Sequence, residues 1–345
     1  MDKRKLGRSG LSIAPMVFGG NVFGWTADEP TSFAMLDRFV ERGFDAIDTA
    51  DVYSAWADGN SGGESETIVG NWLARRKRRD DVVLMTKVGM LEARKGLSAA
   101  NVEAAAEDSL RRLRTDYIDV YFAHVDDAEV PLDETLTAFA RLVESGKVRA
   151  IGASNYGAER LVQALSVSKE RGLPRYEVVQ PRYNLYDRGE FESGLADVTG
   201  DNELGVVCYF ALASGFLSGK YREAKDFEGR DRAVFARNYL NDRGLAILAA
   251  LVLIDVFVPN LFQESLPNRA QDGLTLALSV LIEALPFVVL GVLLSIVVQV
   301  WLPADAIERW LPANPWARRA VLSLLGMLIP VCECGNVPFA RGLMM

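Results

Sequence analysis

Short apolar runs rich in β-branched residues alternate with amphipathic helical patterns through the first 243 residues of this 345-residue chain. Strands separated by helices must pair in parallel, because the crossover helix returns the chain to the same end of the sheet. The runs are apolar almost throughout, which is typical of strands covered on both faces. The pattern predicts an α/β fold, either a doubly wound sheet or a barrel. The seven strand candidates are residues 16–20, 44–49, 82–88, 118–123, 150–154, 177–180 and 206–209.

Two of the intervening helices have limits that the sequence marks clearly. Residues 99–113 carry an apolar stripe at helical spacing, and Ser98 precedes them as an N-cap whose side chain can accept a hydrogen bond. Residues 132–144 carry a second stripe, and Gly146 follows them as a helix stop. These limits predict helices that pack one face on the sheet.

The density of charge falls abruptly near residue 244. Residues 1–243 hold 33 basic and 39 acidic side chains, whereas residues 244–345 hold five and seven. Within the second segment, residues 274–302 contain a single charge, Glu283. A stretch of that length covers the ~20 residues needed to cross ~30 Å of hydrocarbon. We therefore predict two domains, 1–243 and 244–345, the second an all-α membrane fragment.

Two more apolar runs, 245–258 and 320–332, bring this fragment to two or three spans. Arginines concentrate in loop 303–319, and the positive-inside rule places such a loop in the cytoplasm. If residues 245–258 also span, the N-terminal domain is cytoplasmic too. The sequence thus predicts the lipid bilayer as a partner of the C-terminal segment and a membrane location for the chain.

Charge and cysteine content exclude other classes of partner. The chain has 38 Lys and Arg against 46 Asp and Glu, a net charge of −8, which disfavours nucleic acid as a partner. Its three cysteines are too few for a disulfide framework. Cys332 and Cys334 supply two thiolates, half of a tetrahedral metal site. We predict neither nucleic-acid binding nor a metal site.

Polar side chains stand where successive predicted strands end. Asp48, Lys87 and His124 each close a strand, and Tyr53 lies five residues after Asp48. In a barrel these strand ends meet on one face, where active sites are built. Alone, each residue is compatible with an ion pair, ring packing or a structural hydrogen bond. Together they form a set of side chains suited to proton donation. An ammonium lowers the pKa of the tyrosine, a carboxylate holds the lysine, and a neutral histidine orients a carbonyl oxygen.

The run GFDAIDTADVY at residues 43–53 resembles the aldo-keto reductase signature, and KLGRSGL at residues 5–11 resembles the N-terminus of that family. The resemblance covers about residues 3–251. It implies a TIM (β/α)8-type barrel that transfers hydride between NADP(H) and a small carbonyl compound or alcohol. The catalytic tetrad that it implies is Asp48, Tyr53, Lys87 and His124.

The same resemblance implies residues that bind the cofactor. Ser154, Asn155 and Gln180 match the groups that hydrogen-bond the nicotinamide amide, and Tyr209 matches the ring that stacks under it. The segment after Tyr209 matches the loop along the pyrophosphate, with Leu212, Ser214, Gly215 and Lys220 as its cofactor contacts.

The resemblance ends before the eighth strand of the barrel, so we predict a barrel that lacks its last strand. Residues 245–345 resemble instead the predicted permeases similar to organoarsenical or metal efflux proteins, through IPVCECGNVP at residues 329–338. The preferred prediction is an NADP(H)-dependent reductase of aldehydes or ketones, joined to this fragment by fusion or mis-joining of two coding sequences. The alternatives are a truncated permease and a membrane-tethered reductase. If the C-terminal segment is a joining artefact, the reductase is cytoplasmic.

Overall fold

The computed structural model describes residues 2–257 of the chain, and the predictions for residues 258–345 lie outside them. The chain divides into two units, Met1–Gly244 and Leu245–Met345. The first unit contains the sheet and the candidate site.

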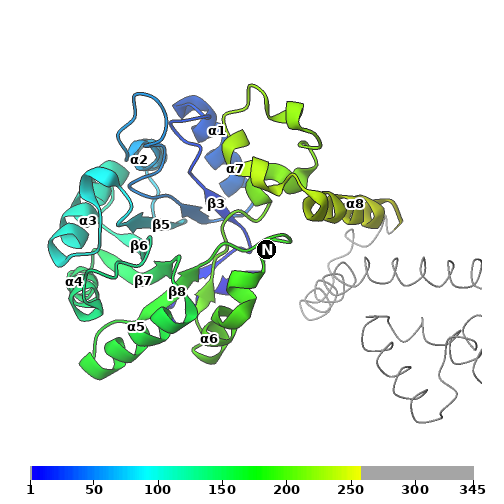
Figure 1. Cartoon of the computed structure of the whole chain (residues 1–345). Helices are drawn as coiled ribbons and strands as arrows, with labels where there is room; N and C mark the ends of the chain where they lie inside the picture. Colours follow the sequence, from blue (N-terminus) through cyan, green and yellow to red (C-terminus); the bar gives the residue numbers. More distant parts are fainter. Residues whose placement is uncertain (1, 258–345) are drawn as a thin grey trace, which may run out of the picture. The chain divides into compact units, whose positions relative to one another are not determined.

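Seven parallel strands form one curled sheet with TIM-like topology (Figure 1). Their spatial order is their order in the sequence, which distinguishes a barrel-type winding from a doubly wound sheet. Each predicted strand run contains or overlaps one of them, so the predicted α/β barrel-type fold is confirmed at this level. The strands are β3 (Val17–Gly19), β4 (Ala46–Asp48), β5 (Val83–Val88), β6 (Ile118–Ala123), β7 (Val148–Ser154), β8 (Tyr176–Gln180) and β9 (Gly205–Val206).

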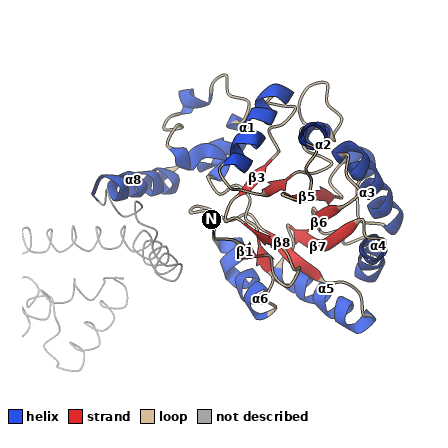
Figure 2. Cartoon of the chain, turned by 180° about the vertical axis from the view of Figure 1, so that it is seen from behind, coloured by secondary structure: helices blue, strands red, loops and turns tan. Residues whose placement is uncertain are grey.

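Helices lie along the outer side of the curled sheet, as Figures 1 and 2 show. They are α1 (Glu29–Glu41), α2 (Glu64–Arg76), α3 (Ala99–Leu113), α4 (Leu132–Glu144), α5 (Ala158–Arg171) and α6 (Ala196–Asp201). The limits of α3 and α4 are the predicted ones, and Gly146 follows α4 with a φ of 75°.

The predicted chemistry of the α3 cap is wrong. Ser98 occupies the N-cap position, but its side chain makes no capping hydrogen bond. The carboxylate of Glu134 on α4 accepts from the Ala99 N–H instead, at 3.0 Å. A tertiary contact therefore replaces the local one, which residue spacing alone does not reveal.

Alternation along the strands divides the core into two layers. Ile47, Leu84 and Tyr121 belong to the layer between the sheet and its helices, whereas their neighbours Met85 and Phe122 belong to a second cluster. This second cluster also contains residues of the N-terminal hairpin formed by β1 (Arg4–Lys5) and β2 (Ser12–Ile13).

The hairpin lies against the amino ends of β8 and β9. Gly7 has a φ of 56°, and a Cβ there would lie 2.5 Å from the Glu177 carbonyl oxygen and 2.8 Å from the Gly205 nitrogen. Only glycine permits so close an approach. The carboxyl ends of the strands, at the opposite end of the sheet, are left for the candidate site.

Within residues 2–257, two further α-helices follow β9: the short α7 (Ala233–Ala236) and α8 (Asp242–Phe257). α8 begins within three residues of the predicted run 245–258 and is rich in apolar residues. None of the helices within residues 2–257 has the length and apolar character needed to cross a bilayer. The runs 274–302 and 320–332, with Glu283, Cys332 and Cys334, lie outside the described residues.

Candidate active site

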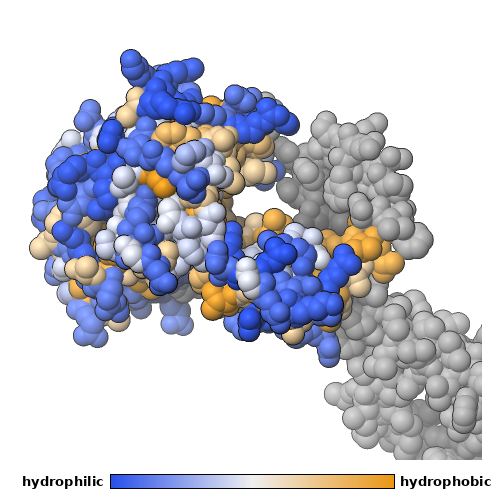
Figure 3. All heavy atoms as spheres, turned by 90° about the horizontal axis from the view of Figure 1, so that it is seen from above, coloured by the Kyte–Doolittle hydropathy of each residue, from blue (hydrophilic) through white to orange (hydrophobic). Residues whose placement is uncertain are grey.

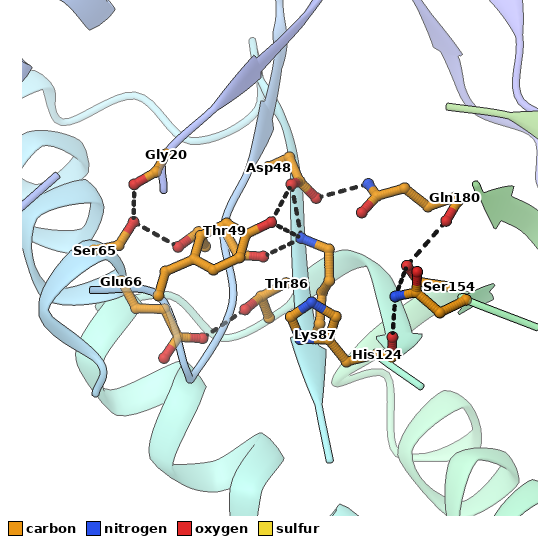
Figure 4. Close-up of polar contacts among 12 residues, drawn as sticks. Gly20, Asp48, Thr49, Ser65, Glu66, Thr86, Lys87, His124, Ser154 and Gln180 are labelled. Atoms are coloured by element: carbon orange, nitrogen blue, oxygen red, sulfur yellow. Dashed lines mark hydrogen bonds and ion pairs between the residues drawn. The ribbon is translucent and has the colours of Figure 1, made fainter. Parts of the chain in front are cut away.

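The four predicted catalytic residues meet at the carboxyl end of the sheet, where Figure 4 shows Asp48, Lys87 and His124. Asp48 is the last residue of β4, Lys87 lies next to the end of β5, and His124 follows β6 directly. Tyr53 lies in the loop after β4. Because β4, β5 and β6 are successive neighbours in the sheet, these side chains come together although they are far apart in sequence.

Lys87 is fully buried, and three oxygens replace the water around its ammonium. Its Nζ donates to Asp48 Oδ2 at 2.7 Å, to the Thr49 carbonyl at 2.8 Å and to the Tyr53 hydroxyl oxygen at 2.8 Å. Burial lowers the pKa of Lys87, and the carboxylate of Asp48 opposes that change. The contact with the Thr49 carbonyl has no signal in the sequence, because any residue could supply it.

The Tyr53 hydroxyl lies between a cation and an anion. It accepts from Lys87 and donates to Asp48 Oδ2 at 3.1 Å. Burial raises the pKa of Tyr53 well above its ordinary value of 10, and the charge of Asp48 raises it further. The expectation of a lowered pKa for Tyr53 is therefore wrong, because burial of the phenol, followed by the charge of Asp48, raises it.

His124 is a neutral imidazole in this setting. Burial, with a smaller contribution from the ammonium of Lys87, lowers the pKa of His124 well below its ordinary value of 6.5. Its ring centroid lies 6.0 Å from that of Tyr53. Within residues 2–257 its Nδ1 is buried and has no hydrogen-bond partner. A neutral ring beside the phenol is able to hydrogen-bond a substrate oxygen without adding charge.

Gln180 and Ser154 join the strand ends of β7 and β8 to this cluster. Gln180 Nε2 donates to Asp48 Oδ1 at 3.1 Å, so the second carboxylate oxygen of Asp48 is also satisfied. Ser154 Oγ donates to the Gln180 carbonyl at 2.9 Å (Figure 4). Both side chains are almost fully buried. These bonds fix the positions of two predicted cofactor ligands.

Asn155 and Tyr209 form the neighbouring part of the network. Asn155 has a φ of 57°, and its Nδ2 donates to the His124 carbonyl at 2.8 Å. The Tyr209 hydroxyl donates to Asn155 Oδ1 at 2.7 Å. The two residues are thus linked to each other and to the strand end that carries His124.

The segment 212–220 lies apart from this network. No hydrogen bond of the described chain joins it to Asp48 or Lys87. Its backbone is left-handed at Ala213, Ser214 and Gly215, a conformation that non-glycine residues rarely adopt. Leu212 is exposed, the hydroxyl of Ser214 is buried without a partner among the described residues, and Lys220 reaches back to Gly215, where a Cβ would lie 3.2 Å from Nζ.

Asp51 is a buried acid that no pattern in the sequence singles out. It is 1% exposed, and neither carboxylate oxygen has a hydrogen-bond partner within residues 2–257. Burial, assisted by the charge of Glu66, raises the pKa of Asp51 to about 7. A carboxylate in a loop is expected to be solvated, so only the tertiary structure reveals this one.

Arg232 is a second such residue. Its Nε is buried and makes no hydrogen bond within the described part of the chain, and burial lowers the pKa of its guanidinium. Nothing in the spacing of residues around it distinguishes it from the four other arginines between residues 220 and 245.

Comparison with known proteins identifies two families along the chain. The model of the aldo/keto reductase family matches residues 15–260, and a model described as a predicted permease matches residues 270–345. Both predicted resemblances are confirmed.

Individual relatives agree with the first of these matches. The uncharacterized oxidoreductase YrpG of Bacillus subtilis (strain 168) is 37% identical over 230 residues, which cover 64% of this chain and 69% of the relative. The aldo-keto reductase YhdN of the same organism is 32% identical over 266 residues, 76% of each chain. The protein tas of Escherichia coli (strain K12) is 31% identical over 279 residues, 73% of this chain and 80% of the relative.

The aldo/keto reductase family match spans more than half of the chain. The chain therefore belongs to the aldo/keto reductase family and is an oxidoreductase of that type, with a permease-family domain at residues 270–345.

Proposed function

We propose that residues 1–243 form a domain that reduces an aldehyde or ketone to an alcohol, with NADP(H) as the cofactor and Tyr53 as the proton donor. The observation that carries this proposal is the fully buried Lys87 with its Nζ 2.8 Å from the Tyr53 hydroxyl and 2.7 Å from Asp48. A phenol held against an ammonium in this way suits the delivery of a proton to a carbonyl oxygen.

The proton moves from the Tyr53 hydroxyl to the substrate oxygen as negative charge develops there. Its raised pKa keeps Tyr53 protonated at neutral pH, so the donor is in its acid form. The phenolate left behind is stabilised by Lys87 at hydrogen-bond distance, and Asp48 keeps that lysine charged and in place. The neutral ring of His124 orients the carbonyl oxygen toward Tyr53.

We propose that the residues at the carboxyl ends of β7 and β8, together with those after β9, bind a dinucleotide. When bound, the cofactor supplies the hydride. We assign Ser154, Asn155 and Gln180 to its amide and the ring of Tyr209 to its nicotinamide face, following the family pattern. The buried hydroxyl of Ser214, which has no hydrogen-bond partner within residues 2–257, supports a role in binding the pyrophosphate for the segment that also contains Leu212, Gly215 and Lys220.

Phosphate groups also need cations, and two are close in sequence to this segment. Lys220 makes no ion pair within residues 2–257, and the Nε of Arg232 is buried without a partner there. Both are therefore available to an anionic group. The family uses NAD(P)H, and the preference for NADP(H) over NAD(H) is part of our proposal.

Oxidation of NADPH in the presence of butanal tests the assigned roles. Tyr53→Phe and Lys87→Met should each lower kcat by ~10²–10⁴-fold, the usual contribution of a general acid. Tyr117→Phe is the matched control, because Tyr117 precedes β6 at the opposite end of the strand from His124. Turnover that is unchanged in both site variants would reject the assignment.

The permease-family match at residues 270–345 favours a second proposal, that this reductase is attached to a membrane by its C-terminal segment. The full chain should then stay with the membrane pellet after carbonate extraction, and residues 1–243 should be released. Release of the full chain from the membrane pellet would count against this attachment and favour a mis-joining of two coding sequences. A peptide that spans residues 235–275, found in the purified protein, would exclude such a mis-joining. Export of a metal or organometal by cells producing the chain would support the permease alternative.

A further inference from the structure

Exposed cations gather at the amino ends of the strands, opposite the candidate active site. Arg4 and Lys5 form β1, whereas Arg42, Lys77 and Arg114 lie in the turns that precede β4, β5 and β6. All five residues are exposed, and none of them makes an ion pair within residues 2–257. We call Arg4, Lys5, Arg42, Lys77 and Arg114 the basic face.

Contacts between neighbouring segments place the basic face on one end of the sheet. Lys3 pairs with Asp45 at 2.7 Å, so the start of the hairpin lies against the turn before β4. Arg79 donates to the Thr115 hydroxyl and to the Tyr117 carbonyl, each at 3.0 Å, so the turns before β5 and β6 also touch. Because β4, β5 and β6 are neighbours in the sheet, the segments of the basic face adjoin one another.

Charge is divided unevenly between this end and the rest of residues 1–243. The segments that carry the basic face are 2–5, 42–45, 75–81 and 114–119. They hold ten Lys and Arg against six Asp, whereas the other residues up to 243 hold 23 Lys and Arg against 33 Asp and Glu. Three of the six acids, Asp2, Asp80 and Asp116, make no ion pair within residues 2–257. A domain with this division of charge turns its basic end toward an anionic surface and its acidic remainder away.

The helix dipole does not by itself explain these cations. Lys and Arg are favourable near the end of a helix, but Arg4 and Lys5 lie in a strand. Lys77 and Arg114 have left-handed backbones, with φ of 55° and 52°, a conformation that favours glycine. Gly172 takes the same conformation after α5, with a φ of 66°. A cation therefore stands at two turns where glycine would be less strained, which favours a function for the charge.

The placement of the cations suits a broad anionic partner. They come from four separate segments, so their charge is spread along one end of the sheet and does not enclose a single small anion. Seen from above, most of the described surface is hydrophilic and the hydrophobic residues form separate patches (Figure 3). The permease-family match at residues 270–345 favours a bilayer as the anionic surface that the chain meets. One Lys or Arg close to anionic headgroups strengthens binding about fivefold.

We propose that the basic face binds the headgroups of an anionic lipid bilayer and that the candidate active site, at the other end of the strands, is directed away from the membrane. This inference goes beyond the proposed reductase chemistry and the proposed attachment through the C-terminal segment, because it concerns a different surface of the chain. A substrate and a cofactor would then reach the site from the aqueous side.

The test measures lysine acylation of the full chain by an amine-reactive ester, read by mass spectrometry. The chain is mixed with vesicles of phosphatidylcholine alone or with equal parts of phosphatidylcholine and phosphatidylglycerol. Phosphatidylglycerol should slow acylation of Lys5 and Lys77 about fivefold or more, and NaCl at about 1 M should abolish the effect by screening. Lys95 is the internal control, because it is 69% exposed and follows the carboxyl end of β5, and its acylation should not change.

A charge-neutral variant separates lipid binding from a structural role. Asn tolerates the left-handed backbone, so Lys77→Asn with Arg114→Asn should keep or raise the thermal midpoint. Its binding to the phosphatidylglycerol vesicles should weaken about fivefold for each charge removed, and Lys5 should lose its protection. Lys95→Asn with Lys225→Asn is the matched control, since it removes two exposed lysines outside the basic face and should leave binding unchanged.

Flotation of the vesicles separates this inference from the proposed attachment. If the chain floats only with phosphatidylglycerol, the attachment through the C-terminal segment fails and the inference stands. If the chain floats with both vesicles, the acylation of Lys5 and Lys77 decides. Flotation with neither, equal acylation in both, or protection retained in the neutral variant overturns the inference. Protection by duplex DNA but not by vesicles would also overturn it. None of these outcomes bears on NADPH oxidation.

Discussion

The ammonium nitrogen of Lys87 lies 2.8 Å from the hydroxyl oxygen of Tyr53, and the lysine side chain is wholly shielded from solvent. Such a cation is stable only where its lost hydration is replaced. Asp48, which also accepts from Tyr53 at 3.1 Å, provides the compensating charge. The proposed chemistry and the stability of this region therefore depend on the same pair of buried charges.

Removal of one member of that pair should destabilise the protein more than removal of both. Lys87→Met leaves the Asp48 carboxylate buried and uncompensated, which should cost about 3–5 kcal/mol of unfolding free energy. Adding Asp48→Asn to Lys87→Met should restore most of the lost unfolding free energy. Urea unfolding measures each value. Lys147→Met removes a partly exposed ion pair with Glu107 and should change stability by less than about 1 kcal/mol. A double variant no more stable than Lys87→Met would contradict the argument.

His124 should remain neutral throughout the physiological range. It is the single histidine of the chain, so its ring signals in a ¹H–¹³C spectrum are unambiguous. Burial, then Lys87, holds the pKa of His124 well below 6.5, so its shifts should not titrate between pH 6 and 8. Below pH 6.5 the folded state binds fewer protons at His124 than the unfolded state does. The stability that His124 contributes is therefore present above pH 6.5 and is lost as the pH falls below that value. A midpoint near 6.5 would show that the ring is solvated.

Asp51 should impose the opposite dependence. Its pKa is raised from 3.8 to about 7 on folding, so the stability that it contributes is present below pH 3.8 and is lost as pH rises to about 7. Asn cannot ionise, so Asp51→Asn removes this fall in stability with rising pH. The variant should be more stable than the parent at pH 8, by at most about 4 kcal/mol. Thermal unfolding from pH 4 to 8 measures the difference. Asp58→Asn, at an exposed carboxylate of the same loop, should leave the parent profile unchanged. If the difference in stability between Asp51→Asn and the parent did not change between pH 4 and pH 8, the raised pKa of Asp51 would be contradicted.

Gly70 should be intolerant of a methyl group. A Cβ at this position in α2 would lie 2.0 Å from the Arg112 carbonyl oxygen and 2.8 Å from the backbone of Leu113. The backbone cannot yield cheaply, so Gly70→Ala should lose about 2 kcal/mol or more despite its better helix propensity. Gly200 in α6 has no atom within 4 Å of its Cβ position, and Gly200→Ala should gain up to about 1 kcal/mol. Equal effects of the two substitutions would refute the close approach of α2 to α3.

Local patterns along the chain were sufficient to predict much of the fold. The limits of α3 and α4 follow from apolar periodicity, and the strands from short apolar runs, because both depend on which faces a segment must bury. The prediction of a Ser98 side-chain cap is wrong because the carboxylate of Glu134, on a different helix, accepts the hydrogen bond from the Ala99 N–H. The positions of Asp48, Lys87 and His124 at strand ends were also readable, because parallel strands bring their carboxyl ends to one side.

The strands and the residue types at their ends could be read from the linear order of residues, and the family resemblance implied the barrel-type strand order that the structure shows. The protonation chemistry of those residues could not, because it depends on the folded arrangement. Tyr53 illustrates the difference: the type of its neighbours predicts a lowered pKa, but the burial of the phenol raises it. Desolvation depends on every atom that excludes water from a group, and those atoms come from segments that are far apart in the sequence. A linear pattern records which charges are present, whereas the free energy of each charge depends on the three-dimensional arrangement around it.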